Sequence, residues 1–223
     1  MSFDGTNDSI AFTETQFDIE DDRDLLTIAF WAKRTDNNDI AVVLGNSAGG
    51  SKQIIWFDND GDLLTITGDQ SSGQHADAPV TADTNWHHYV ITTTGESGNV
   101  AATTMYEDGA AITVNNTNLG VADNKDFTIN RIGTDAATDG SREFKGLLYQ
   151  IAIWNVVLDA DAVAAIYNSG NPIPLQEDKG NYNNSGDLMH LWKFDEGTGS
   201  TTADTIGSLD GTITNATFSS TTP

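Results

Sequence analysis

The sequence contains no cysteine. Disulfide scaffolds, thiolate zinc sites and cysteine nucleophiles are therefore excluded, and stability has to come from packing or from a bound cation. Basic residues are scarce as well: 10 Lys and Arg stand against 33 Asp and Glu, and the formal net charge is -23. Because such a field repels phosphate and anionic lipid, we expect no nucleic-acid partner and no membrane insertion.

Long apolar runs are also missing, and none approaches the eighteen or so residues of a membrane span. The first residues, 1–5, lack the basic and apolar regions of a secretory signal, so we expect either release without classical secretion or a trimmed chain. What is present suffices for a core: 38% of the 223 residues are hydrophobic, and five are Trp. These values predict one folded domain.

Short apolar runs separated by Ser, Thr, Asn, Asp and Gly predict an all-β chain. Residues 26–32 and 147–154 alternate as strands do, and both of their faces are apolar, which indicates central strands covered on each side. Further predicted strands span residues 9–12, 40–44, 53–57, 63–67, 88–94, 102–106, 127–132 and 188–194.

Two turns and one helix separate these strands. Asp58 to Gly61 and the pair Asp108-Gly109 predict hairpins, because Asn, Asp and Gly tolerate positive φ. The predicted helix spans residues 159–167. Asp159 is its N-cap, and Leu158 and Val163 are spaced for a hydrophobic staple. Asn168 to Gly170 ends the helix, and a polar loop follows to Gly186.

Placed in order, several segments resemble the laminin-G-like jelly-roll domain of the concanavalin A-like lectin and glucanase superfamily. The opening strand and turn, residues 2–8, and the Trp-containing strand, residues 26–33, fit this pattern. So do the Trp-His-His run of residues 85–90 and the Tyr-x-Asp-Gly hairpin of residues 105–109. Residues 144–167 are similar to the closing strand and helix of pentraxins. The resemblance implies a two-sheet antiparallel jelly-roll sandwich with one short helix near the C-terminal third.

The C-terminal residues carry a second part of this resemblance. Residues 188–199 resemble a segment that often precedes the opening strand in such domains, but here they follow the helix. We therefore predict one domain over residues 1–223 in which residues 187–223 complete the sandwich. Truncation after Gly170 is then expected to expose the core. Residues 181–186 and the tail from Ser219 are predicted as surface of low charge.

Ca²⁺ is the cofactor that the sequence allows, because Asp-rich turns supply the oxygen ligands it needs. Asp135 and Asp139 lie just before the strand near residue 145, where the pentraxin resemblance implies acidic metal ligands. Asp4 and Asp8 flank a tight turn and form the second candidate pair. The alternative interpretation of both pairs is a set of solvated turns, which is common in a chain so rich in Asp.

A catalytic motif is not found in the sequence. Glucanases of this superfamily carry a Glu-x-Asp-x-x-Glu pattern, which does not occur here. His87 and His88 are adjacent in a predicted strand, so they have to point to opposite faces, which argues against a shared catalytic role. Most of the five Trp are expected in the core. We therefore predict that the protein is not an enzyme.

The leading hypothesis is a binding or structural module on a virion surface, such as a capsid decoration or fibre protein of a bacterial virus. Its predicted partners are other virion or cell-surface proteins and surface glycans, and a homo-oligomer is expected. The predicted location is the virion surface or the extracellular space. The runner-up is a carbohydrate-binding module of a secreted protein, and a glycoside hydrolase comes third.

Overall fold

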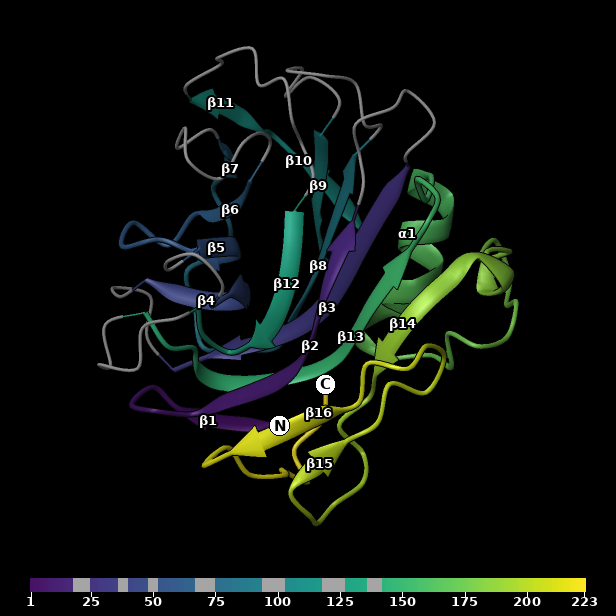
Figure 1. Cartoon of the computed structure of the whole chain (residues 1–223). Helices are drawn as coiled ribbons and strands as arrows, with labels where there is room; N and C mark the ends of the chain where they lie inside the picture. Colours follow the sequence, from purple (N-terminus) through teal and green to yellow (C-terminus); the bar gives the residue numbers. More distant parts are fainter. Residues whose placement is uncertain are drawn as a thin grey trace.

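The computed structural model describes residues 1–17, 25–35, 40–47, 52–66, 75–93, 103–117, 127–135 and 142–223. These residues form two antiparallel sheets and one α-helix (Figure 1). The predicted all-β sandwich with a short helix is thereby confirmed. No helix in the described part of the chain is both long enough and apolar enough to cross a membrane.

Sheet A has seven strands among the described residues, and β13 (Lys145–Trp154) pairs with three of them. Its order is β1 (Ser2–Asp4), β13, β3 (Leu26–Arg34), β8 (His87–Thr93), β9 (Thr103–Glu107) and β10 (Ala110–Ile112). A further strand, β14 (Leu188–Trp192), pairs with the C-terminal half of β13. Because β1 pairs with residues 145–147, β1 and β14 follow one another along the same long strand.

Sheet B has nine described strands. Their order is β11 (Asn115–Thr117), β7 (His75–Ala78), β6 (Leu63–Ile66), β5 (Lys52–Phe57), β4 (Ala41–Asn46), β12 (Phe127–Ile132), β2 (Ser9–Phe17), β16 (Gly211–Thr214) and β15 (Thr201–Thr202). The C-terminal strands therefore reach both sheets, with β14 in sheet A and β16 beside β2 in sheet B.

Two hydrophobic cores result, one on each face of sheet A. Strand β3 shows the division, since Ile28 and Phe30 belong to the core between the sheets whereas Ala29 belongs to the other. The second core lies beneath α1 (Ala160–Tyr167) and the chain that follows it, and it includes Trp154 and Tyr182. In Figure 1, α1 and strands β4–β7 accordingly lie on opposite sides of β3, β8 and β13.

The helix has the predicted capping. The Asp159 side chain accepts a hydrogen bond from the Ala162 N–H at 2.8 Å, which satisfies one free amide of the first turn. Leu158 and Val163 are both buried in the second core, as the predicted staple requires. Asn168 adopts left-handed φ of 47° and ends the helix, before two short 3₁₀ segments, η2 (Asn168–Gly170) and η3 (Ser185–Asp187).

The two predicted hairpins form, but with different turns. Asp108 and Gly109 both have positive φ, 50° and 79°, and join β9 to β10 through two residues, as in a type I′ turn. A Cβ at Gly109 would also lie 2.9 Å from the Tyr167 ring, so space favours glycine there. The link between β5 and β6 is longer, and within it Gly61 supplies the positive φ of 87° while the Asp58 carboxylate accepts the Asp60 N–H.

Candidate functional site

The C-terminal half of the chain forms an open depression of about 440 Å³ on the surface. Its walls combine three aromatic rings, one carboxylate and several hydroxyl groups, contributed mainly by Tyr149, Phe194, Asp195, Phe218, Ser219 and Ser220, with Gly197 and Thr222 beside them. Aromatic faces and a few convergent polar groups are the usual lining of small-molecule sites. We therefore take this depression, called the Tyr149 pocket below, as the candidate site.

Three segments far apart in sequence build the Tyr149 pocket. Tyr149 comes from β13, just before the bulge at Gln150, where φ is 49°. Phe194 has a positive φ of 60°, its side chain is buried, and Asp195 beside it is exposed. The tail is held in place because Ser2 and Thr217 exchange two backbone hydrogen bonds of 2.7 and 3.0 Å. The termini accordingly lie together in Figure 1.

An ion pair sets the charge at the Tyr149 pocket. The Nζ of Lys193 lies 2.9 Å from Oδ2 of Asp195, and half of the Asp195 side chain is exposed. Burial raises the pKa of Tyr149, and the nearby Asp195 charge adds to this effect while Lys193 opposes it. The Tyr149 hydroxyl is therefore protonated at neutral pH and can donate a hydrogen bond to a ligand.

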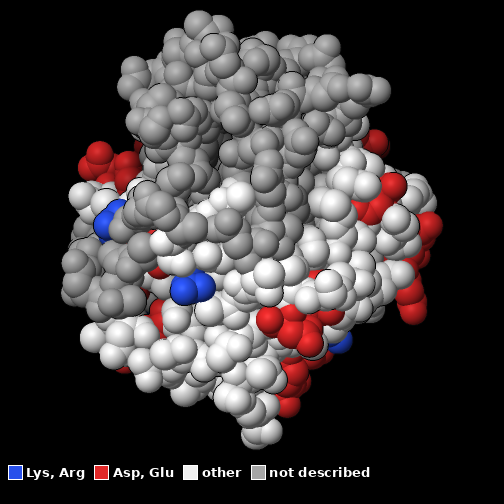
Figure 2. Space-filling model, viewed as in Figure 1, with Lys and Arg blue, Asp and Glu red and all other residues white. Residues whose placement is uncertain are grey.

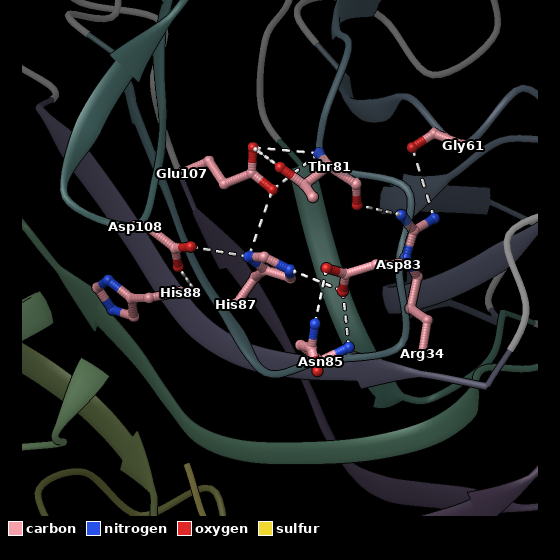
Figure 3. A network of polar contacts seen from close by, with 9 residues as sticks. All are labelled: Arg34, Gly61, Thr81, Asp83, Asn85, His87, His88, Glu107 and Asp108. Carbon is pink, nitrogen blue, oxygen red and sulfur yellow. Dashed lines mark hydrogen bonds and ion pairs between the residues drawn. The ribbon is translucent and has the colours of Figure 1, made fainter. Parts of the chain in front are cut away.

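A second polar cluster surrounds His87, between the loop before β8 and the β9–β10 hairpin (Figure 3). The Nδ1 of His87 lies 2.8 Å from Asp108 Oδ2 and 3.6 Å from Glu107 Oε1, and the Nε2 of His87 lies 3.0 Å from Asp83 Oδ1. Glu107 in turn accepts the Thr81 N–H at 2.9 Å. The cluster thus joins the 81–85 loop to the hairpin.

Charges around His87 favour the imidazolium form. Burial alone would lower its pKa, but the contacts with Asp108 and Asp83 outweigh burial and raise it. The Asn85 N–H and the His87 ring hold the pKa of Asp83 at about 2. Since both ring nitrogens face carboxylates within the protein, we interpret the cluster as structural. His88 points to the other face, as predicted, where its buried ring stacks on Tyr167 and makes a tilted contact with Trp31.

A third cluster, His190 with Asp204, also organises the fold. Asp204 Oδ2 lies 2.7 Å from His190 Nδ1 and accepts the Leu209 N–H, while Oδ1 accepts the amides of Leu191 and Gly207. Burial alone would raise the pKa of Asp204, but these hydrogen bonds hold it far below its ordinary value. The carboxylate therefore fixes the chain around residues 204–209 to β14.

The predicted calcium ligands Asp4 and Asp8 lie in one turn, as expected. The carboxylate of Asp8 accepts the Asp4 N–H at 2.5 Å, and that of Asp4 accepts the Thr6 N–H at 2.8 Å. Asp8 is buried, and this burial raises its pKa. Both carboxylates thus stabilise the turn itself, and a Ca²⁺ site here stays a prediction.

Of the other predicted pair, one residue lies within the described chain and the other lies outside it. Asp135 is buried and its Oδ2 lies 2.9 Å from Arg142 Nη1, whereas Asp139 lies outside the described residues. Within the described ranges, no three or more His, Asp or Glu side chains form a group able to hold a metal ion. The role of Asp135 that the structure shows is that of an ion-pair partner.

The sequence did not reveal the residues of the Tyr149 pocket as a site. Tyr149 and Phe194 lie in predicted strands, where aromatic side chains are expected in the core. Residues 218–222 have an ordinary tail composition. The expectation for Trp holds for Trp31, Trp154 and Trp192, which are fully buried, while Trp56 and Trp86 are half-buried. Residues 181–186 were predicted as surface, but Tyr182 is fully buried in the second core.

Acidic side chains are scattered over the described part of the face in Figure 2, with few basic ones between them. This distribution agrees with the net charge of -23. A surface of this sign favours neutral or cationic ligands over anionic ones.

Comparison with known proteins places the chain in a family. Residues 4–164 match the family model described as the concanavalin A-like lectin/glucanases superfamily, in its laminin-G-like branch. Among solved structures, a candidate carbohydrate-binding protein from Bacteroides ovatus is similar at a TM-score of 0.63 and 16% identity. The alignment covers 95% of this chain and 57% of that one, so the chain spans little more than half of the Bacteroides protein. A search of curated proteins finds no match.

Two further solved structures are less similar. A heptameric SAP-like pentraxin from Limulus polyphemus has a TM-score of 0.48 and 15% identity, over 96% of this chain and 98% of that one. A sialidase from Trypanosoma rangeli has a TM-score of 0.48 and 10% identity, over 67% of this chain and 23% of the sialidase. Identities this low concern the fold and say nothing about a shared ligand.

Proposed function

Because the chain belongs to the concanavalin A-like lectin/glucanase superfamily, we propose that it is a non-enzymatic carbohydrate-binding module whose sugar occupies the Tyr149 pocket. The observation that carries this proposal is the convergence of Tyr149 and Phe218 with the Asp195 carboxylate and the Ser219 and Ser220 hydroxyls. Sugar rings present apolar faces that pack on aromatic rings, and their hydroxyls need carboxylate and hydroxyl partners.

Binding without cleavage fits the chemistry of this lining. Most glycoside hydrolases use two carboxyl groups that flank the scissile bond. The described residues that line the Tyr149 pocket include one carboxylate, Asp195, whose Oδ2 is already paired with Lys193. The name of the Bacteroides ovatus relative, which covers 95% of this chain, also points to carbohydrate binding.

A glycan array followed by calorimetry tests the proposal. Tyr149→Ala and Phe218→Ser are expected to weaken binding about tenfold or more, because each removes a ring from the pocket. Ile206→Ser is the matched control, since Ile206 is an exposed apolar side chain outside the lining. If all three variants bind the sugar equally well, the site lies elsewhere on the protein. Release of reducing sugar from laminarin, xylan or sialosides would favour the hydrolase instead.

The biological setting in which the protein binds its sugar is a separate and more specific proposal. A virion decoration or fibre protein remains our leading setting, and a carbohydrate-binding module of a secreted protein is the alternative. Both settings place the acidic surface outside the cell, where a neutral glycan is an available partner. Immuno-electron microscopy of purified native particles separates them, because regular labelling of a particle is expected in the first setting alone.

A further inference from the structure

On the premise of the proposed function, the geometry points to uncharged sugars as the ligand class of the Tyr149 pocket, with acidic sugars rejected through the ion pair of Lys193 and Asp195. An acidic sugar such as a uronic or sialic acid carries a carboxylate that needs a cation or several donors on binding. None of the described residues that line the pocket is Lys or Arg.

The cation beside the pocket is already engaged. Lys193 Nζ lies 2.9 Å from Asp195 Oδ2, so the charge that would attract an acidic sugar is neutralised within the protein. An incoming carboxylate would have to displace Asp195, or else lie close to its like charge. The net charge of -23 adds a long-range field against any anion.

A neutral sugar meets none of these costs. Half of the Asp195 side chain is exposed, so sugar hydroxyls can reach its carboxylate and donate hydrogen bonds to it. Lys193 fixes the position of that carboxylate before a ligand arrives, which lowers the entropy lost on binding. The Tyr149 hydroxyl, kept protonated by burial and by Asp195, supplies a donor on another wall.

The direct test compares sugars that differ only at carbon 6. Saturation-transfer NMR and calorimetry are run with the methyl glycosides of glucose, galactose and mannose and with the corresponding glucuronide, galacturonide and mannuronide. At least one neutral glycoside is expected to bind, and its uronide to bind at least about tenfold more weakly. A uronide that binds as tightly as its neutral partner overturns this inference and leaves the proposed function standing. Binding of no sugar at all overturns both.

Substitutions of the ion pair sharpen the test. Asp195→Asn is expected to weaken neutral binding about tenfold and to strengthen uronide binding about tenfold, because it releases the Lys193 charge. Lys193→Gln keeps the Asp195 charge, so rejection of uronides is expected to persist. Asp161→Asn, an exposed carboxylate in α1, is the control for a change in net charge alone. If Asp195→Asn and Asp161→Asn give the same small change, Asp195 does not set the specificity.

Discussion

Residues 4–164, which match the family model, and the C-terminal residues 165–223 contribute in different ways. The first region supplies most of both sheets and the greater part of the core between them. The second region supplies one strand to sheet A, two to sheet B, part of a second core and most of the Tyr149 pocket. A shared fold in the first region therefore does not locate the candidate site, because that site depends on the second.

The largest expected effect comes from removing residues 171–223, which make up most of the second region. Truncation after Gly170 deletes Tyr182, Leu191 and Trp192, which are all fully buried. We expect the remaining chain to lose its cooperative unfolding transition, as followed by tryptophan fluorescence in urea. Truncation after Phe218 is the control, since it removes pocket residues and no described strand. A cooperative transition in the shorter chain would show that the first region folds independently.

Trp154 tests the contact between the two regions. It lies in β13, is fully buried, and donates a hydrogen bond of 3.0 Å from Nε1 to the Tyr182 hydroxyl. Trp154→Ala is expected to lower the free energy of unfolding by about 3–5 kcal/mol, because it leaves a large cavity. Tyr182→Phe removes this bond and the one that the Tyr182 hydroxyl donates to the Leu175 carbonyl at 2.8 Å, and it is expected to cost about 1–3 kcal/mol because two buried groups lose their partner. An unchanged denaturation midpoint for Trp154→Ala would contradict the burial of this ring.

Addition of calcium tests for a metal site within the first region. If Asp4 and Asp8, or Asp135 and Asp139, bind Ca²⁺ in the folded state alone, a hundredfold excess over the dissociation constant raises stability by about 2.7 kcal/mol. Chelation is expected to reverse this rise in thermal unfolding. Sodium chloride at matched ionic strength is the control, because screening alone relieves a charge of -23. Asp8→Asn and Asp139→Asn then assign the effect to one pair, and an equal effect of sodium removes the need for a site.

The smallest effect is the pH dependence of the His87 cluster. The pKa of His87 is raised in the folded state. The stabilisation that this shift brings is therefore complete below the pKa of the unfolded state, near 6.5, and is lost as the pH rises through the pKa of the folded state. Denaturation at several pH values is expected to show stability that falls as the pH rises above about 6.5, and His87→Gln is expected to abolish this slope. His75→Gln, in sheet B, is the control. The same pH slope in His87→Gln and the wild type would exclude this role.

Local sequence determined the parts of the fold whose physics is local. The helix follows from Asp159 and the staple of Leu158 and Val163, and the β9–β10 turn follows from Asp108 and Gly109, because each motif satisfies its own backbone within a few residues. The pattern of residues 26–32 also revealed a strand covered on both faces. Strand β7 was missed, since His75–Ala78 has only two small apolar residues and depends on its neighbours.

Tertiary structure alone decided the candidate site. Tyr149, Asp195 and Phe218 are separated by dozens of residues, and they meet because β14 pairs with β13 and the tail pairs with Ser2. The sequence of a strand or tail shows its own periodicity, but it does not show which segment it pairs with. No local pattern therefore predicts the contact between these residues. The same reason explains why the sequence did not reveal the contact between Asp135 and Arg142, while a role of Asp135 as a calcium ligand stays a prediction.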